Sequence, residues 1–179
     1  MESATLKILM GEIPLFDLLN HLQKDHLAEF IQYSFYKKGS VVFSEGEKGG
    51  TLYYIISGKV EVIKESMAGE KTVLAKYRKG VTIGEMSLVD KSTRSATVKA
   101  VEDTEMLYLN SASFEEILKL HPQTGIQLLK NIASHLSMRL RDASGKLADL
   151  SAYTKFDDEG RRDIPKEFSD TGKIDRRKI

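Results

Sequence analysis

The chain of 179 residues is 41% hydrophobic and 30% charged, and it contains no cysteine. Its 27 Lys and Arg residues nearly balance its 26 Asp and Glu residues, for a formal charge of +1, so binding of nucleic acid by bulk electrostatics is not expected. The lack of cysteine excludes disulfides, thiolate metal sites and cysteine nucleophiles. Because no secretory signal and no membrane-spanning apolar run of about 20 residues is recognisable, the expectation is a cytoplasmic protein with no membrane partner.

Residues 1–32 are predicted to form an N-terminal helical segment. Pro14 suits the first turn of a helix, and the apolar residues that follow it recur at helical spacing. These residues are Phe16, Leu19, Leu22, Leu27, Phe30 and Ile31.

Residues 33–121 contain short β-rich runs separated by glycines, at the roughly 8–12-residue spacing that is typical of an antiparallel barrel or sandwich. The runs are 41–43, 52–56, 60–63, 72–77, 96–101 and 105–109. Val60 and Val62 alternate with charged neighbours, so both are predicted to face inward. A short helix follows that ends near His121, and Ser111 or Ser113 is predicted to cap it.

Residues 122–150 are predicted to form one long C-terminal helix. Its apolar residues alternate steps of three and four, which is the a/d pattern of a coiled coil and favours a homodimer with two-fold symmetry. The alternative is a helix that packs back on its own barrel. The pattern, named here the seam, consists of Ile126, Leu129, Ala133, Leu136, Leu140, Ala143, Leu147 and Leu150.

The last segment, residues 151–179, carries 15 charged residues among 29 and is predicted to be a tail that is disordered or depends on a partner. It lacks the two apolar helical faces of a helix-turn-helix, so the expected partner is a protein and not nucleic acid. The fold class predicted for the whole chain is mainly β with flanking helices. Its centre is an antiparallel, jelly-roll-like β-roll barrel with a short helix inside the β region.

Catalysis has no support in the residue pattern. The four histidines, His21, His26, His121 and His135, all fall in predicted helices, whereas a metal-dependent barrel needs ligands that converge from strands. No phosphate loop and no Ser/His/Asp set is recognisable. The prediction is a protein that is not an enzyme and holds no metal.

The segment from Gly80 to Ala100 carries the most informative chemistry. Two glycines bracket a short strand, and about one helical turn then starts at Glu85, where unpaired N–H groups favour an anion. Gly84 permits close approach of a ligand, and Arg94 can donate paired N–H groups to a phosphate. Glu85 would repel a phosphate but can accept a hydrogen bond from a hydroxyl. Together these groups indicate a sugar phosphate.

Two motifs give the chain a family resemblance. Gly84-Glu85-x-Ser87-Leu88 followed by Arg94-Ser95-Ala96-Thr97 resembles the phosphate-binding cassette of cyclic nucleotide-binding domains. The segment from Glu45-Gly46-Glu47 to Val62 resembles the family's second signature. The resemblance covers about residues 10 to 150, and the family includes the regulatory subunits of cAMP-dependent protein kinase and the bacterial catabolite activator protein.

The resemblance implies a role for each matched residue. Arg94 would pair with the exocyclic phosphate oxygen, and Glu85 would hold the ribose 2′-hydroxyl. The other implied ligand-binding residues are Gly84, the amides of Met86 and Ser87, Ser95, the pocket walls Val62 and Leu74, and Arg139, with Ser137 and Arg141 as alternatives to Arg139 for the base.

The function implied is a receptor for cAMP, with cGMP possible, that relays occupancy through its C-terminal helix to a partner protein. The alternative is a dimeric interaction scaffold of the same fold that binds no nucleotide.

Overall fold

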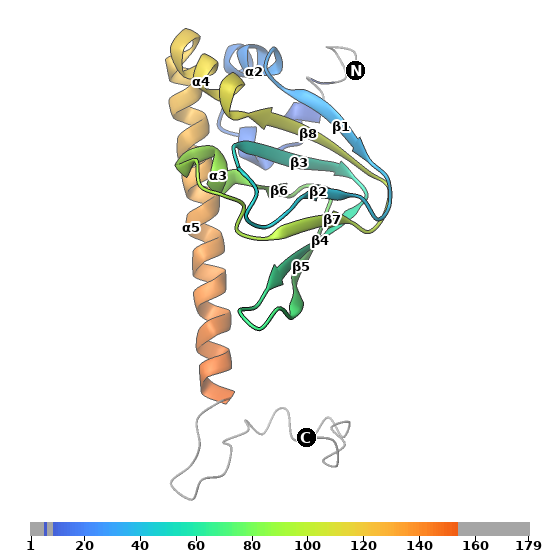
Figure 1. Cartoon of the computed structure of the whole chain (residues 1–179). Coiled ribbons are helices and arrows are strands. Elements are labelled where there is room, and N and C mark those ends of the chain that lie inside the picture. The colour runs from blue at the N-terminus through green and yellow to red at the C-terminus, as the bar shows by residue number, and fades with distance from the viewer. Residues whose placement is uncertain (1–5, 7–8, 154–179) are drawn as a thin grey trace, which may run out of the picture. The chain divides into compact units, whose positions relative to one another are not determined.

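The computed structural model describes residue 6 and residues 9–153. Within them, eight strands form two four-stranded antiparallel sheets, with the orders β1-β8-β3-β6 and β2-β7-β4-β5 (Figure 1). The strands are β1 (Gln32–Tyr36), β2 (Val41–Phe43), β3 (Thr51–Ser57), β4 (Lys59–Glu65), β5 (Lys71–Arg78), β6 (Thr82–Ile83), β7 (Thr97–Ala100) and β8 (Thr104–Asn110). This antiparallel arrangement with flanking helices confirms the predicted fold class.

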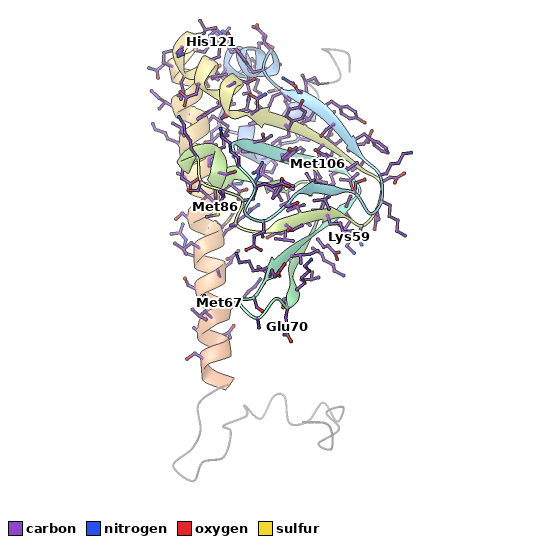
Figure 2. The ribbon with its side chains drawn as sticks, viewed as in Figure 1. Lys59, Met67, Glu70, Met86, Met106 and His121 are labelled. Carbon is purple, nitrogen blue, oxygen red and sulfur yellow. The ribbon has the colours of Figure 1, made fainter. Side chains whose placement is uncertain are left out.

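The core lies between the inward faces of the two sheets. Its buried cluster comprises Phe43, Ile55, Val60, Ile83, Val98 and Met106, and the last of these is labelled in Figure 2. The alternation predicted in β4 is present, because Val60 is fully buried and Val62 packs partly buried against the same cluster. Burial of such side chains is the main favourable contribution to the stability of the roll.

The N-terminal segment is divided into short pieces instead of one continuous helical run. A 3₁₀ turn, η1 (Pro14–Phe16), is followed by α2 (His21–Ala28). Asn20 starts α2 through a capping box with Gln23, in which each side chain accepts a hydrogen bond from the other residue's N–H group. Leu22 is mostly exposed, whereas Phe16 and Leu27 are buried.

Two helices follow the strands, α4 (Ser111–Leu120) and α5 (Pro122–Tyr153). Asn110 caps α4, since its side chain accepts a hydrogen bond from the N–H of Ser113 at 2.9 Å. The predicted serine caps were therefore wrong, and the capping residue lies one position before Ser111.

The chain divides into two compact units, Met1–His135 and Leu136–Ile179. The first turns of α5 belong to the first unit and are anchored there by buried Leu128 and Ile132. Asn131 is also buried, and its side chain donates to the carbonyl of Leu15 at 2.7 Å. The residues of the predicted tail from 154 onward lie outside the described part of the chain.

Candidate ligand-binding site

The predicted anion-binding turn is formed by β6, Gly84 and the helix α3 (Glu85–Asp90). Gly84 has a left-handed backbone, with φ +74°. A Cβ atom at this position would lie 2.4 Å from Nη1 of Arg94 and 2.7 Å from the carbonyl oxygen of Thr51. Both the backbone conformation and the space therefore require glycine.

The backbone of Arg94 is held by the segment that carries the second motif. The N–H of Arg94 donates to the carbonyl of Glu47 at 2.8 Å, and the N–H of Gly46 donates to the carbonyl of Arg94 at 2.9 Å. The two motifs, almost fifty residues apart in sequence, are thus one structural unit that sets the position of this arginine.

The side chain of Arg94 is turned into the protein and is only 6% exposed. Its Nη1 donates to Oγ of Ser87 at 2.7 Å and to the carbonyl of Gly84 at 3.2 Å. Its Cζ lies 4.0 Å from the centroid of the Phe43 ring and 5.9 Å from that of Tyr53. Burial lowers the pKa of Arg94 from its usual value, because desolvation disfavours the charged form. An arginine nevertheless stays protonated at neutral pH.

The guanidinium of Arg94 has no carboxylate within 4.0 Å among the described residues. Its Nε and Nη2 also lack a hydrogen-bond partner there. Since every buried side-chain nitrogen or oxygen in the described part of the chain has a partner, these two nitrogens must reach solvent. One edge of the guanidinium is thus anchored to the protein, and the other edge is open.

Ser87 contributes its hydroxyl group in a way that the motif alone did not indicate. Besides accepting from Arg94, Oγ accepts from the N–H of Gly50 at 3.2 Å and donates to the carbonyl of Gly84 at 3.1 Å. A Cβ at Gly49 would lie 2.1 Å from Cβ of Ser87, so this loop requires glycine to close over α3. Ser87 therefore links the loop, the turn and the arginine.

Two further predicted residues lie on the first turn of α3. Glu85 is buried, and as the first helical residue it lies where a carboxylate is favoured by the helix dipole. Met86 is half exposed, and Figure 2 labels it on α3. The amides at this turn have no acceptor within the helix, so their predicted role toward a phosphate stays a prediction.

The predicted pocket walls differ in orientation. Val62 in β4 pairs directly with Ala75 in β5, and the register then shifts, so that Ile63 pairs with Val73. Leu74 lies at this irregularity and is 61% exposed. Ala75 is the residue that faces Val62 across the two strands, and sequence alone gave no signal for the shift.

The backbone of Ser95 is contacted by Lys64, a residue of β4 in the hairpin that β4 and β5 form. Nζ of Lys64 donates to the carbonyl of Ser95 at 2.8 Å and also forms an ion pair with Glu45. The hydrogen bond from Lys64 holds the pKa of Glu45 below its usual value. Arg139 lies on α5 in the Leu136–Ile179 unit, and its role in base recognition stays a prediction.

A metal centre has no candidate in the described residues, where no group of three or more His, Cys, Asp or Glu side chains gathers. The rings of His26 and His121 stack with centroids 3.7 Å apart, and the second of these is labelled in Figure 2. Among the helices of the described chain, none is long and apolar enough to cross a membrane.

The family of cyclic nucleotide-binding domains matches residues 33–121, which include every group around Arg94 described above. The chain belongs to this family. The chain is 36% identical over 138 residues to the cyclic AMP receptor protein of Thermus thermophilus, a match that covers 77% of this chain and 62% of that protein. The crystal structure of the Thermus thermophilus catabolite activator protein superposes with a TM-score of 0.68 at 35% identity and covers 78% of this chain and 64% of that one.

Other relatives place the same domain in different proteins. Lysophospholipase NTE1 of Chaetomium globosum is 29% identical over 70% of this chain, which is 8% of that enzyme. The regulatory subunit of a cAMP-independent protein kinase A from Trypanosoma brucei matches at 25% identity with a TM-score of 0.63, over 76% of this chain and 51% of that one. The chain thus spans less than two thirds of each of these relatives.

Proposed function

We propose that the chain is a cyclic nucleotide receptor that binds cAMP at Arg94. The observation that carries this proposal is the buried guanidinium, which has one open edge and no carboxylate within 4.0 Å among the described residues, where Glu47 and Glu85 act on it only from a longer distance. A buried charge without an adjacent charge of opposite sign is unfavourable. A bound phosphate would compensate it through two charge-assisted hydrogen bonds.

The neighbouring groups favour a sugar phosphate over a simple anion. Glu85 is buried beside the cassette and would hold the ribose 2′-hydroxyl, since a carboxylate accepts hydrogen bonds from hydroxyl groups. The name of the Thermus thermophilus relative supports cAMP. The relative from Trypanosoma brucei, in contrast, is the regulatory subunit of a cAMP-independent kinase, so binding of cAMP needs a direct test. The alternative cyclic nucleotide to compare with it is cGMP.

The receptor would relay occupancy through α5 to a partner protein. Support for self-association comes from the seam, whose Leu140 and Leu147 are both mostly exposed. The buried apolar residues in the first turns of α5, Leu128 and Ile132, are not part of the seam. A second copy of the chain would cover the seam with the pattern that coiled coils use. Sedimentation of the protein should therefore give the mass of a dimer.

A thermal-shift series followed by calorimetric titration tests the proposal. Ligand at about 100 times its Kd stabilises the folded state by about 2.7 kcal/mol, so cAMP or cGMP should raise Tm, and adenosine, which lacks the phosphate, should not. A chain that forms dimers but shows no shift with either cyclic nucleotide would contradict the receptor. It would then be the interaction scaffold.

A further inference from the structure

An aromatic ring in the core of the roll lies directly against the charged group of the proposed site. Phe43, the last residue of β2, is 9% exposed, and its ring centroid lies 4.0 Å from Cζ of Arg94. The face of an aromatic ring carries negative potential and attracts a guanidinium, and the attraction grows when both groups are removed from water. Burial of both residues satisfies that condition.

We infer that Phe43 is a positioning residue that holds the guanidinium of Arg94 in the orientation that binds the phosphate; the inference rests on the function proposed above. Two acceptors, the carbonyl of Gly84 and the hydroxyl of Ser87, hold one edge of the guanidinium through Nη1. The Phe43 ring holds its face. With one edge and one face fixed, Nε and Nη2 remain directed at the open side where the ligand would bind.

The ring itself is fixed by its surroundings. Phe43 pairs with Val98 in β7, and the Tyr53 ring stacks on it with centroids 5.9 Å apart and an angle of 28°. Tyr36 in turn contacts Tyr53 edge to face, at 6.4 Å. An aromatic side chain braced in this way lies in one rotamer, so it can orient Arg94 instead of following it.

The same short segment holds both the backbone and the side chain of Arg94. Phe43 ends β2, and Gly46 and Glu47 follow within four residues to form the two backbone hydrogen bonds with Arg94. Residues 43–47 therefore contact both the side chain and the backbone of Arg94. This arrangement gives the arginine a preformed geometry, which reduces the ordering that a ligand would have to impose.

Two substitutions of Phe43 distinguish the effect of its aromatic face on Arg94 from the effect of its side-chain volume. Leucine is apolar and would keep most of the packing, but it has no ring face for the cation. Tyrosine would keep the face. Phe114 provides a matched control, since it is also a buried phenylalanine, 5% exposed, but lies in α4. Phe114→Leu removes the same atoms without touching Arg94.

The test is a calorimetric titration of the full chain with cAMP and cGMP for wild type, Phe43→Leu, Phe43→Tyr and Phe114→Leu. Phe43→Leu should weaken binding of the preferred nucleotide about tenfold, as expected for loss of a desolvated cation–π contact. Phe43→Tyr should stay within about threefold of wild type, and Phe114→Leu should bind like wild type although it lowers Tm. Phe43→Met serves in place of the leucine variant if that protein does not fold.

A nuclear magnetic resonance measurement reports on the contact without any ligand. A proton held over the face of an aromatic ring is shifted upfield, so the Nε–H signal of Arg94 should move downfield in Phe43→Leu and stay in place in Phe114→Leu. Equal affinities of Phe43→Leu and Phe114→Leu, or an Arg94 signal that does not move, would overturn the inference. If wild type binds neither nucleotide, the proposed function is wrong, and with it the role of Phe43 toward a ligand. In that case the Nε–H signal of Arg94 would still move downfield in Phe43→Leu, which separates this outcome from a failure of the contact itself.

Discussion

The turn around Arg94 and the seam of α5 break the usual pattern of burial in opposite ways. At the turn, Glu85, Ser87 and Arg94 are buried although all three are polar. On the seam, Leu140 is apolar and 69% exposed. Buried polar groups and exposed apolar stretches are the informative exceptions to the rule that apolar residues lie inside.

The two exceptions call for different kinds of partner. The turn has a preorganised geometry, in which Ser87 and Gly84 anchor one edge of a guanidinium and leave the other open. It needs a small ligand that supplies negative charge. The seam is a regular row of apolar side chains along one helix. It needs a partner helix with a row of apolar side chains of similar length. Substitutions in one region should therefore leave the other region unchanged.

Removal of the charge at the turn should have the largest effect. Arg94→Ala should weaken cyclic nucleotide binding by about 2–5 kcal/mol, because the phosphate would be left without its buried partner. Calorimetric titration measures the loss. Arg78→Ala is the control, since Arg78 lies exposed at the end of β5 and its removal should leave the affinity unchanged. Binding by Arg94→Ala that matches the control would contradict the assigned site.

Placement of a charge on the seam should dissociate the proposed dimer and leave the turn intact. Leu140→Asp should weaken self-association by about 1.5–3 kcal/mol for each chain, which is the value of burying one leucine. Analytical ultracentrifugation reports the change in mass. Met138→Asp is the control, because Met138 is also an exposed apolar residue of α5 but lies outside the seam. A dimer that survives Leu140→Asp, or that both variants disrupt equally, would contradict the seam as the interface.

Two glycines extend the comparison to the backbone. Gly84→Ala should destabilise the fold by at least about 1–2 kcal/mol, because its left-handed backbone disfavours a Cβ and the Cβ would collide with Arg94. Gly145 lies in α5, where an added Cβ would meet no atom of the described chain within 4 Å. Gly145→Ala should therefore stabilise the helix by up to about 1 kcal/mol. Urea unfolding of both variants measures the difference, and a change of the same sign in both would contradict this account.

Sequence reasoning worked best where the information is local. The turn at Gly84 and the arginine ten residues later form a compact motif, so the sequence predicted that they belong to one site. It named Ser87 only for its amide and did not indicate the hydroxyl that accepts a hydrogen bond from Arg94. The ring of Phe43 was not, because it meets Arg94 only when β2 and the segment before β7 come together in space. Its apolar character fits a core residue equally well, and no spacing in the sequence distinguishes the two roles.

The errors in the fold have similar causes. β1 (Gln32–Tyr36) was not among the predicted strands. Its apolar residues Tyr33 and Phe35 are exposed, so the strand does not show the pattern of apolar residues on its inward face by which strands are recognised. The cap of α4 was assigned to a serine because the choice between neighbouring capping residues depends on one hydrogen bond, which Asn110 makes. Such choices depend on a few atoms whose positions the sequence pattern does not determine.

The smallest expected effect concerns the ion pair that holds the segment after Arg94. The hydrogen bond from Lys64 lowers the pKa of Glu45, so this carboxylate contributes stability above its unfolded pKa of about 4.3. The contribution is lost as the pH falls through the lower folded value. The difference in Tm between wild type and Glu45→Gln should therefore be present at pH 6 and disappear toward pH 3.

The control for this pH series is Glu61→Gln, since no ion pair involves Glu61 within the described chain. This substitution removes a carboxylate from the same strand as Lys64 and leaves the ion pair of Lys64 with Glu45 in place. Because Lys64 also binds the carbonyl of Ser95, acid should loosen the segment that carries Arg94 and weaken ligand binding over the same pH range. If the stability and the ligand affinity of Glu45→Gln decrease with falling pH as steeply as those of wild type, this ion pair does not position the arginine.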